Sequence, residues 1–511
     1  MGGAPQHPPV QYDGGSRPKP APLLYEVNTR QWLRGLSDRH ARRIDLATVP
    51  ESELDGWSEL GFTHVWLMGV WPTGPRSRAQ ALADEGLRRA YADSLPGWHE
   101  NDVLGSPYAM AAATVWSGLG GDAALAAFRS RLRARGLRLL LDFVPNHLGL
   151  DHPWLEAQPH LFVHASREFA GSFRCETRAG ELFVAHGKDP HFAPWTDTAQ
   201  LDHRRAATRA TMTDLLASIA ARCDGVRCDM AMLVLGDVFA RTWGHTPDPE
   251  PRRPGEFWAE AIPRIRSEHP DFLFLAEAYW GLEPRLQALG FDVTYDKGLY
   301  DLVMERRAAQ AQGHLVSQPP TLLAASAHFR ENHDEPRVAS RLSLDEHRAA
   351  ALLVLGLPGT RFLHDGQLQG LRRFARIQLG RRALEAEDPQ IAGVYRRLLA
   401  TLAVTCVGRG EGRVLPTHRA WSDNRSDESM VLAQWQDDER RFELVVVNLA
   451  PYRSQCYAPL SARGLAAGSW RMTDLLGHEA YERNGQEMSA RGLYLDVPPH
   501  AAQLFHFERI G

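Results

Sequence analysis

Short apolar runs alternate with longer amphipathic stretches rich in Ala, Leu and Arg through most of the first 400 residues. This alternation is typical of βαβ units and a parallel sheet. Eight runs stand out, at residues 23–27, 64–69, 137–143, 225–229, 272–277, 291–295, 326–332 and 360–365. Eight parallel strands close a (β/α)₈ barrel. The pattern therefore predicts an α/β fold with a TIM-type barrel over residues 21–400.

One predicted helix shows the amphipathic pattern clearly. In residues 121–136, Leu125, Phe128 and Leu132 fall on one stripe, and arginines occupy the opposite face. Gly136 provides a C-terminal stop just before the third apolar run. The stripe indicates a helix that packs its apolar side against the sheet.

Three segments lack the alternation of apolar runs and amphipathic stretches that predicts the barrel. Residues 148–205 are rich in Pro, His, Phe and Trp and too long for an ordinary βα connection, which predicts a small inserted domain after the third strand. Residues 401–511 alternate apolar and polar positions in the runs 441–451, 469–476 and 490–508, which predicts a C-terminal antiparallel β-sandwich. Residues 1–20 are rich in Pro and Gly, and we expect a disordered leader there.

Composition narrows the partners and the compartment. The chain has 58 basic and 62 acidic residues spread along its length, for a net charge of −4, so we expect no nucleic-acid partner. No apolar run approaches the ~18 residues of a membrane span, so we expect no membrane partner. Five cysteines, an odd number without CxxC spacing, indicate reduced thiols, and a Cys223–Cys228 disulfide is disfavoured because Cys228 falls within a predicted strand. Since the first residues lack the features of a secretory signal, we expect a cytoplasmic protein.

Ionisable residues gather where predicted strands end. The third run finishes in DFVPNH, the fourth in GVRCDM, the fifth in LAEAYW and the seventh in ENHDEPR. In a (β/α)₈ barrel the active site lies at the carboxyl ends of the strands. We therefore expect these side chains to meet at one mouth of the barrel.

Arg227 and Asp229 form the first candidate pair. Side chains alternate along a strand, so these two point the same way and Cys228 points to the other face. If the pair faces into the barrel, Arg227 can hold Asp229 ionised, as a nucleophile requires. The alternative is a buried ion pair that only fixes the register of the strand.

Glu277 is the second candidate carboxyl. Glycoside hydrolysis needs one ionised carboxylate and one protonated carboxylic acid. The apolar lead-in FLFL and the adjacent Tyr279 and Trp280 predict a raised pKa for Glu277, which suits the acid. The alternative is that Glu277 only caps its strand.

The runs DFVPNH, GVRCDMAM, FLAEAYWG and ENHDEPR, in this order, resemble the four signature regions of glycoside hydrolase family 13, the α-amylase family. YEVNTRQW, VWLMGVWPTG, NDVLGSPYAM and LPGTRFLHDGQ also resemble family segments, so the likeness covers roughly residues 21–510. The resemblance implies a nucleophile at Asp229, an acid/base at Glu277 and a third carboxylate at Asp334 that binds the sugar. It further implies supporting or sugar-binding roles for Arg227, His147, His333 and Asp142, with Asn146 bracing the floor.

Two positions depart from the family pattern. Gly105 is followed by Ser106 and Pro107 before Tyr108, where many members have Tyr directly after Gly, so Tyr108 is the candidate stacking residue. Residues 232–233 are Met-Leu where many calcium-dependent α-amylases have Lys-His, so we expect no metal, and Asn146 remains the candidate ligand if calcium binds. Among the tryptophans near strand ends, Trp280 is the preferred sugar platform because it lies three residues beyond Glu277.

The resemblance predicts a retaining enzyme that acts on α-glucosidic bonds of an α-glucan or oligosaccharide through a covalent glycosyl intermediate. A transglycosidase, such as a trehalose- or maltose-forming or glucan-remodelling enzyme, shares this chemistry and is the main alternative. A non-catalytic carbohydrate-binding barrel is a further alternative. Such a protein is expected to have lost at least one carboxylate, whereas all three are present here.

Overall fold

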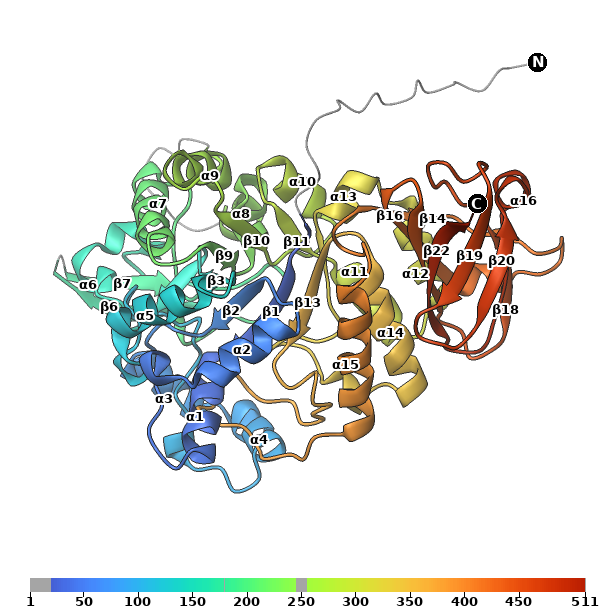
Figure 1. Cartoon of the computed structure of the whole chain (residues 1–511). Helices are drawn as coiled ribbons and strands as arrows, with labels where there is room; N and C mark the ends of the chain where they lie inside the picture. Colours follow the sequence, from blue (N-terminus) through green and yellow to red (C-terminus); the bar gives the residue numbers. More distant parts are fainter. Residues whose placement is uncertain (1–19, 179, 245–254, 511) are drawn as a thin grey trace, which may run out of the picture.

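The computed structural model describes residues 20–178, 180–244 and 255–510. Its centre is a closed barrel of parallel strands in the order β1-β13-β12-β11-β10-β9-β3-β2 (Figure 1). The barrel strands are β1 (Leu23–Asn28), β2 (His64–Met68), β3 (Arg138–Phe143), β9 (Gly225–Cys228), β10 (Leu273–Ala276), β11 (Val293–Tyr295), β12 (Ser326–His328) and β13 (Thr360–His364). Each coincides with one of the eight apolar runs, so the predicted barrel is confirmed. The predicted leader falls outside the described residues except for Pro20.

Helices cover the outside of the barrel and fill its connections. They are α1 (Thr29–Arg39), α2 (Glu51–Glu59), α3 (Pro75–Ala83), α4 (Glu85–Ser94), α5 (Gly121–Arg133), α7 (Ala206–Ala220), α8 (Gly236–Trp243), α9 (Phe257–Glu268), α10 (Glu283–Ala288), α11 (Lys297–Met304), α12 (Ala308–Ser317), α13 (Pro320–Ala324), α14 (Leu344–Gly356) and α15 (Pro389–Ala403). The predicted helix over 121–136 is α5, and Leu125, Phe128 and Leu132 are all buried. Gly136 adopts φ 73° between α5 and β3, which suits its predicted role as a stop.

A small inserted domain follows β3, as predicted. It contains β4 (His147–Gly149), α6 (Trp154–Ala157), β5 (His164–Ala165), β6 (Ser172–Thr177), β7 (Gly180–Ala185) and β8 (Thr198–Gln200). The strands form a β5-β7-β6 sheet and a β4-β8 ladder, both antiparallel. The β4-β8 ladder starts at His147, directly beyond the end of β3, and so ties the insertion to the barrel mouth.

The C-terminal region forms two packed antiparallel sheets, also as predicted. Their elements are β14 (Glu411–Leu415), β15 (His418–Arg419), β16 (Met430–Asp438), β17 (Arg441–Asn448), β18 (Ser454–Ala458), β19 (Ser469–Asp474), β20 (Ala480–Asn484), α16 (Gly485–Arg491), β21 (Leu493–Val497) and β22 (Ala502–Ile510). The sheets run β14-β16-β17-β22-β19-β20 and β15-β18-β21. The Trp435 indole N–H donates to the Gly356 carbonyl at 2.7 Å, which attaches this domain to α14 of the barrel.

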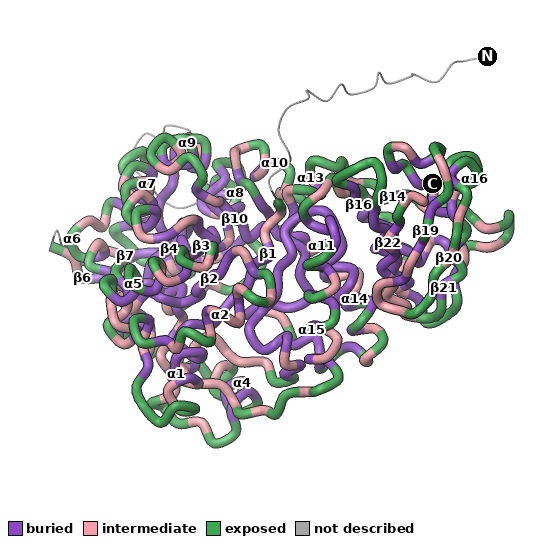
Figure 2. The backbone as a smooth tube through the Cα atoms, in the orientation of Figure 1, coloured by how far each residue is buried: buried purple, intermediate pink, exposed green. Residues whose placement is uncertain are grey.

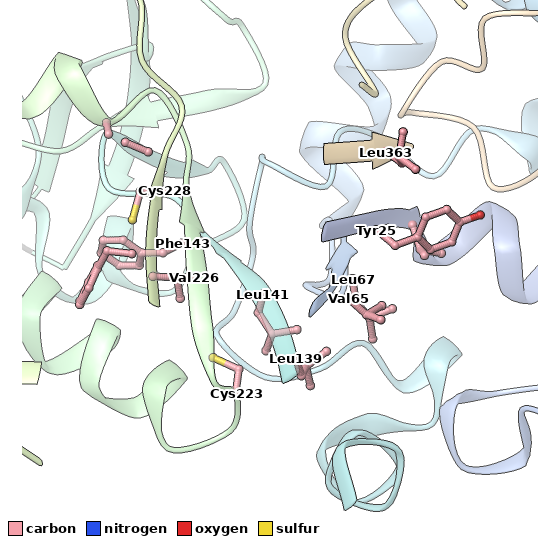
Figure 3. Close-up of a cluster of buried hydrophobic side chains, with 14 of the residues drawn as sticks. Tyr25, Val65, Leu67, Leu139, Leu141, Phe143, Cys223, Val226, Cys228 and Leu363 are labelled. Atoms are coloured by element: carbon pink, nitrogen blue, oxygen red, sulfur yellow. The ribbon is translucent and has the colours of Figure 1, made fainter. Parts of the chain in front are cut away.

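The outer face of the barrel strands carries the main apolar core. Figure 2 shows in purple how much of the barrel backbone is buried. Leu139, Leu141 and Phe143 of β3 and Val226 and Cys228 of β9 belong to this layer, as Figure 3 shows. Cys228 therefore faces the helices, as its alternation with Arg227 predicts. All five cysteines are buried and unpaired, which agrees with reduced thiols.

No helix in the described part of the chain is both long and apolar enough to cross a membrane.

Candidate active site

Arg227 joins the two main candidate carboxyls. It is 1% exposed near the end of β9, and its guanidinium lies 2.7 Å from Asp229 Oδ1 and 2.8 Å from Glu277 Oε2. The backbone N–H of Met230 donates to the same Glu277 oxygen at 2.6 Å. Glu277 therefore contacts the residue that directly follows Asp229. The same guanidinium bridges the two carboxyls, so they lie close together.

Burial and charge put these two carboxyls in unlike states. Burial raises the pKa of Glu277 to about 7, with Arg227 opposing the rise and Asp229 adding to it. The raised pKa predicted for Glu277 is thus present, and burial is its main cause. Burial also raises the pKa of Asp229, while the neighbouring guanidinium acts against that rise through charge and a hydrogen bond. Near neutral pH, such a pair retains a proton most readily on Glu277.

Asp334 is linked through His333 to a second, buried carboxylate. His333 lies between two carboxylates, with Nδ1 2.5 Å from Glu26 Oε1 and Nε2 3.0 Å from Asp334 Oδ2. Burial alone lowers the pKa of His333, but the two carboxylates outweigh it and raise that pKa well above its ordinary value. The charged imidazole in turn lowers the pKa of Asp334 against the effect of its enclosure. The Asp334 side chain is still 46% exposed because it opens onto a concave surface.

Glu26 was not among the predicted site residues. It is fully buried in β1 and supports His333 from below. The sequence does contain one signal for it: Glu26 is the single carboxylate in the apolar run LLYEV. A carboxylate buried in a strand requires a partner, so its position indicated a buried polar contact. The sequence could not say that this partner lies more than 300 residues away.

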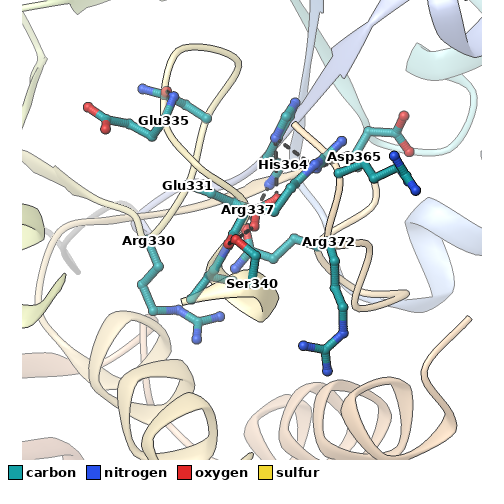
Figure 4. Close-up of polar contacts among 12 residues, drawn as sticks. Arg330, Glu331, Glu335, Arg337, Ser340, His364, Asp365 and Arg372 are labelled. Carbon is teal, nitrogen blue, oxygen red and sulfur yellow. Dashed lines mark hydrogen bonds and ion pairs between the residues drawn. The ribbon is translucent and has the colours of Figure 1, made fainter. Parts of the chain in front are cut away.

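A buried clasp holds the loop that carries Asp334 (Figure 4). Arg337 lies 2.7 Å from Glu331 Oε1 and also donates to the Asp365 carbonyl at 2.6 Å. The other Glu331 oxygen accepts the backbone N–H of Val338 at 2.7 Å. Within the loop, Asn332 Oδ1 accepts the backbone N–H of Asp334 at 2.9 Å. The two ends of the loop are therefore closed together, and Asp334 is fixed at its tip.

Asp142 and the surrounding rings form the floor beneath the carboxyls. Asp142 is fully buried, and its oxygens accept from the Trp66 indole at 3.0 Å and the Gly69 backbone at 2.8 Å. Both oxygens of Asp142 therefore bond the protein, an arrangement that suits the bracing of this floor. The Arg227 guanidinium lies over the rings of Trp66 and Tyr108 at 5.2 Å.

A cavity of about 390 Å³ opens above this floor. Asp229, Glu277 and Asp334 line it together with His147 and Tyr108. Burial lowers the pKa of His147 to about 3, so this imidazole is neutral near neutral pH. The Tyr108 hydroxyl lies 2.9 Å from His333 Nε2, and its ring stacks on that imidazole at 5.5 Å. Of the predicted sugar-binding side chains, the structure thus brings His147 and Tyr108 to the cavity.

The tryptophan that lines the cavity is not the expected one. Trp280 does not line the cavity; it is 43% exposed at its outer side and has φ 65°. Trp195 of the inserted domain lines the cavity instead, with its ring 5.1 Å from His147. Trp71 is fully buried and donates to the Asp142 carbonyl, and Trp98 packs on Tyr91. Trp195 is therefore the indole best placed against a bound ring.

Asn146 does not fit a calcium site. Its Oδ1 accepts from the Gln200 side chain at 3.0 Å, and its Nδ2 donates back to Gln200 Oε1 at 3.2 Å. Calcium needs six to eight oxygen ligands, several of them carboxylates in most sites. Nowhere in residues 20–178, 180–244 and 255–510 do three His, Cys, Asp or Glu side chains come together as metal ligands.

Comparisons with known proteins agree with this geometry. Residues 51–440 match the family model described as "Alpha amylase, catalytic domain". The chain is 27% identical to an α-amylase of Haloarcula japonica over 50% of this chain and 35% of the relative. It is 20% identical to α-amylase 3 of Dictyoglomus thermophilum over 68% of this chain and 64% of the relative. It thus spans about a third of the first relative's length and just under two thirds of the second.

Solved structures show the same fold over nearly the whole chain. A noncanonic maltogenic α-amylase from Thermotoga neapolitana superposes with a TM-score of 0.65 at 18% identity, covering 96% of this chain and 99% of that one. A debranching enzyme from Nostoc punctiforme superposes with a TM-score of 0.64 at 14% identity, covering 96% and 100%. With the family model matching residues 51–440, the chain belongs to the α-amylase family.

Proposed function

We propose that this protein is a retaining α-glycosidase that cleaves α-glucosidic bonds of oligo- or polysaccharides. The observation that carries the proposal is the shared guanidinium of Arg227, which holds Asp229 and Glu277 side by side while the pKa of Glu277 stands at about 7. A retaining glycosidase needs two carboxyls at roughly 5–5.5 Å, one ionised and one protonated.

In the first step, an oxygen of Asp229 attacks the anomeric carbon and forms a β-glycosyl ester. The bond to the leaving oxygen breaks, and Glu277 gives its proton to that oxygen. Asp334, which the charged His333 keeps ionised, accepts hydrogen bonds from the ring hydroxyls and favours the positive charge that develops on the sugar.

In the second step, water enters the place vacated by the leaving group. Glu277, now ionised, takes a proton from that water, and the oxygen attacks the anomeric carbon. The ester bond to Asp229 breaks, so the free sugar retains the α configuration. A sugar hydroxyl in place of water would give transfer through the same two steps.

Proton NMR during digestion of maltooligosaccharides tests the proposal. We expect the signal of the α-anomeric reducing end to appear first and the β signal to follow by mutarotation. Initial release of the β anomer would exclude the double displacement, because a single displacement inverts the configuration. Signals of new glycosidic linkages would assign the protein to transfer.

A further inference from the structure

One side of the cavity is closed by α3 and α4. These two helices follow β2, and Gln80, Asp84 and Leu87 line the same cavity as the catalytic carboxyls. Gln378, from the loop between β13 and α15, lines it beside them. Figure 1 shows α3 and α4 at one edge of the barrel, between the inserted domain and the chain leading to α15.

This wall is fastened to the inserted domain. The Ser77 hydroxyl donates to the Asp197 carbonyl at 2.8 Å and accepts the Leu150 backbone N–H at 3.1 Å. The Asp151 carboxylate accepts the backbone N–H groups of Arg76 and Ser77 at 3.0 Å. The start of α3 is therefore held by paired backbone and side-chain bonds.

The other flank of the wall is fastened to the loop after β13. Leu379 of that loop packs in a buried cluster with Tyr91 of α4 and with Leu95, which directly follows α4. The backbone N–H of Leu104 donates to the Gln378 carbonyl, and that of Gly380 to the Asp102 carbonyl, both at 2.7 Å. The inserted domain, α3–α4 and the β13–α15 loop thus form a continuous barrier.

The barrel order shows which strand lies opposite the barrier. Two parts of the barrier follow β2 and β13, which flank β1 in the closed ring of eight strands, and the third part, the inserted domain, follows β3 beside β2. The strand farthest from β1 in that ring is β10, reached after four steps in either direction. Glu277 and Trp280 follow β10. Here Trp280 is 43% exposed, and the inserted domain extends round to meet it: the His191 ring lies 4.9 Å from the Trp280 ring, and the next residue, Phe192, is 74% exposed.

The two sides correspond to the two parts of a substrate. The acid must touch the oxygen that leaves, so the leaving chain lies on the Glu277 side, toward the exposed rings. The sugar attacked by Asp229 then extends the other way, toward the barrier. That direction leads to the non-reducing end of the chain.

We propose that this enzyme cleaves α-glucan chains from their non-reducing end. The inference rests on the proposed function and adds a substrate class to it: chains with a free terminal glucose. The end of the chain occupies the cavity against α3–α4, and the leaving part rests on Trp280 and Phe192. The volume of 390 Å³ is at the lower end of the ~300–1,000 Å³ of small-molecule sites, which suits a chain end and not a long internal stretch.

Polar groups at the closed end suit a terminal sugar. Gln378 Oε1 is buried and has no hydrogen-bond partner within the described part of the chain, and Gln80 also lines the cavity. Asp84, which also lines the cavity, caps α4 by accepting the Leu87 backbone N–H on Oδ1 at 2.8 Å. A terminal glucose has a free 4-hydroxyl that a 1,4-linked internal unit lacks. A site built to bond a substrate hydroxyl can reject an analogue lacking it by ~10⁴-fold.

Maltooligosaccharides capped at the non-reducing end test the proposal. A benzylidene acetal across the terminal 4- and 6-hydroxyls removes both donors and adds bulk. We expect the cap to lower the rate of new reducing ends by at least ~100-fold relative to the uncapped substrate. Equal cleavage of both substrates would overturn the inference while leaving the glycosidase intact. Cleavage of neither would overturn the proposed function and the inference together.

Paired variants locate the two sides. Leu87→Ala thins the wall, so we expect discrimination against the cap to weaken. Phe192→Ala removes a ring from the open side, so KM should rise more for long chains than for short ones, with discrimination against the cap retained. Tyr452→Ala, an exposed aromatic in the C-terminal domain, is the matched control and should change neither property. The opposite assignment of effects would place the chain in the reverse direction and refute the proposal.

Discussion

The hydroxyl of Tyr279 offers a direct way to move the pKa of the proposed acid. It donates to Glu277 Oε1 at 2.7 Å, on the carboxyl oxygen that Arg227 does not contact. This bond is strongest when Glu277 is ionised, so it opposes the rise that burial causes. Tyr279→Phe keeps the ring and removes only the hydroxyl. We expect the pKa of Glu277 to rise further in this variant.

The magnitude follows from the strength of the bond. A hydrogen bond to a charged group contributes about 1.5–3 kcal/mol, and one pKa unit corresponds to about 1.4 kcal/mol. Because Tyr279 is partly exposed, water replaces some of the lost bond, and the lower end of that range applies. The expected rise is therefore about one pH unit, starting from a pKa of about 7.

The assay is the pH dependence of kcat/KM, which reports the pKa values of the free enzyme. Glu277 acts in its protonated form, so activity falls as pH rises through its pKa. The wild-type alkaline limb should lie near pH 7 and shift upward by about one unit in Tyr279→Phe. Tyr457→Phe, in β18 of the C-terminal domain, is the control and should not move the limb. An alkaline limb that stays in place or moves down in Tyr279→Phe would refute the assignment of Glu277 as the acid.

Three further outcomes are expected. Asp229→Asn should lower kcat at least ~10³-fold with the midpoint of thermal unfolding nearly unchanged. Activity close to wild type would exclude Asp229 as the nucleophile. Glu331→Gln should lower the free energy of urea unfolding by about 3–5 kcal/mol, because Arg337 is left buried without its carboxylate partner. The folded pKa of Glu331 is lowered to about 2, so the stabilisation by this pair in the wild type should be lost as the pH drops from 4.5 toward 2. Trp435→Phe should lower the free energy of unfolding by about 1–3 kcal/mol, because the Gly356 carbonyl is left unpaired. An unchanged unfolding midpoint would argue against that contact.

The barrel was predictable because its strands are buried on both faces and appear as short runs in which most residues are apolar. The end of each run then indicated which side chains meet at the mouth. Alternation along β9 correctly separated Arg227 from Cys228, and the apolar lead-in to Glu277 indicated its raised pKa. These features depend only on neighbouring residues, which the sequence displays directly.

The remaining parts of the site depend on distant contacts. The residues of α3 and α4 are mostly small or polar, and they form a wall of the cavity only through hydrogen bonds to Asp151 and packing against Leu379. Trp280 follows Glu277 closely in sequence, yet its left-handed backbone turns it to the outside of the cavity. The partnership of Glu26 with His333 likewise arises only when the barrel closes.

The single cation at Arg227 limits how the pH optimum of this enzyme can be engineered. Because one guanidinium contacts Asp229 and Glu277, any replacement there changes the acidity of both groups together. Independent adjustment requires a residue that contacts only one of them. Tyr279 is such a residue, because its hydroxyl bonds the Glu277 carboxyl.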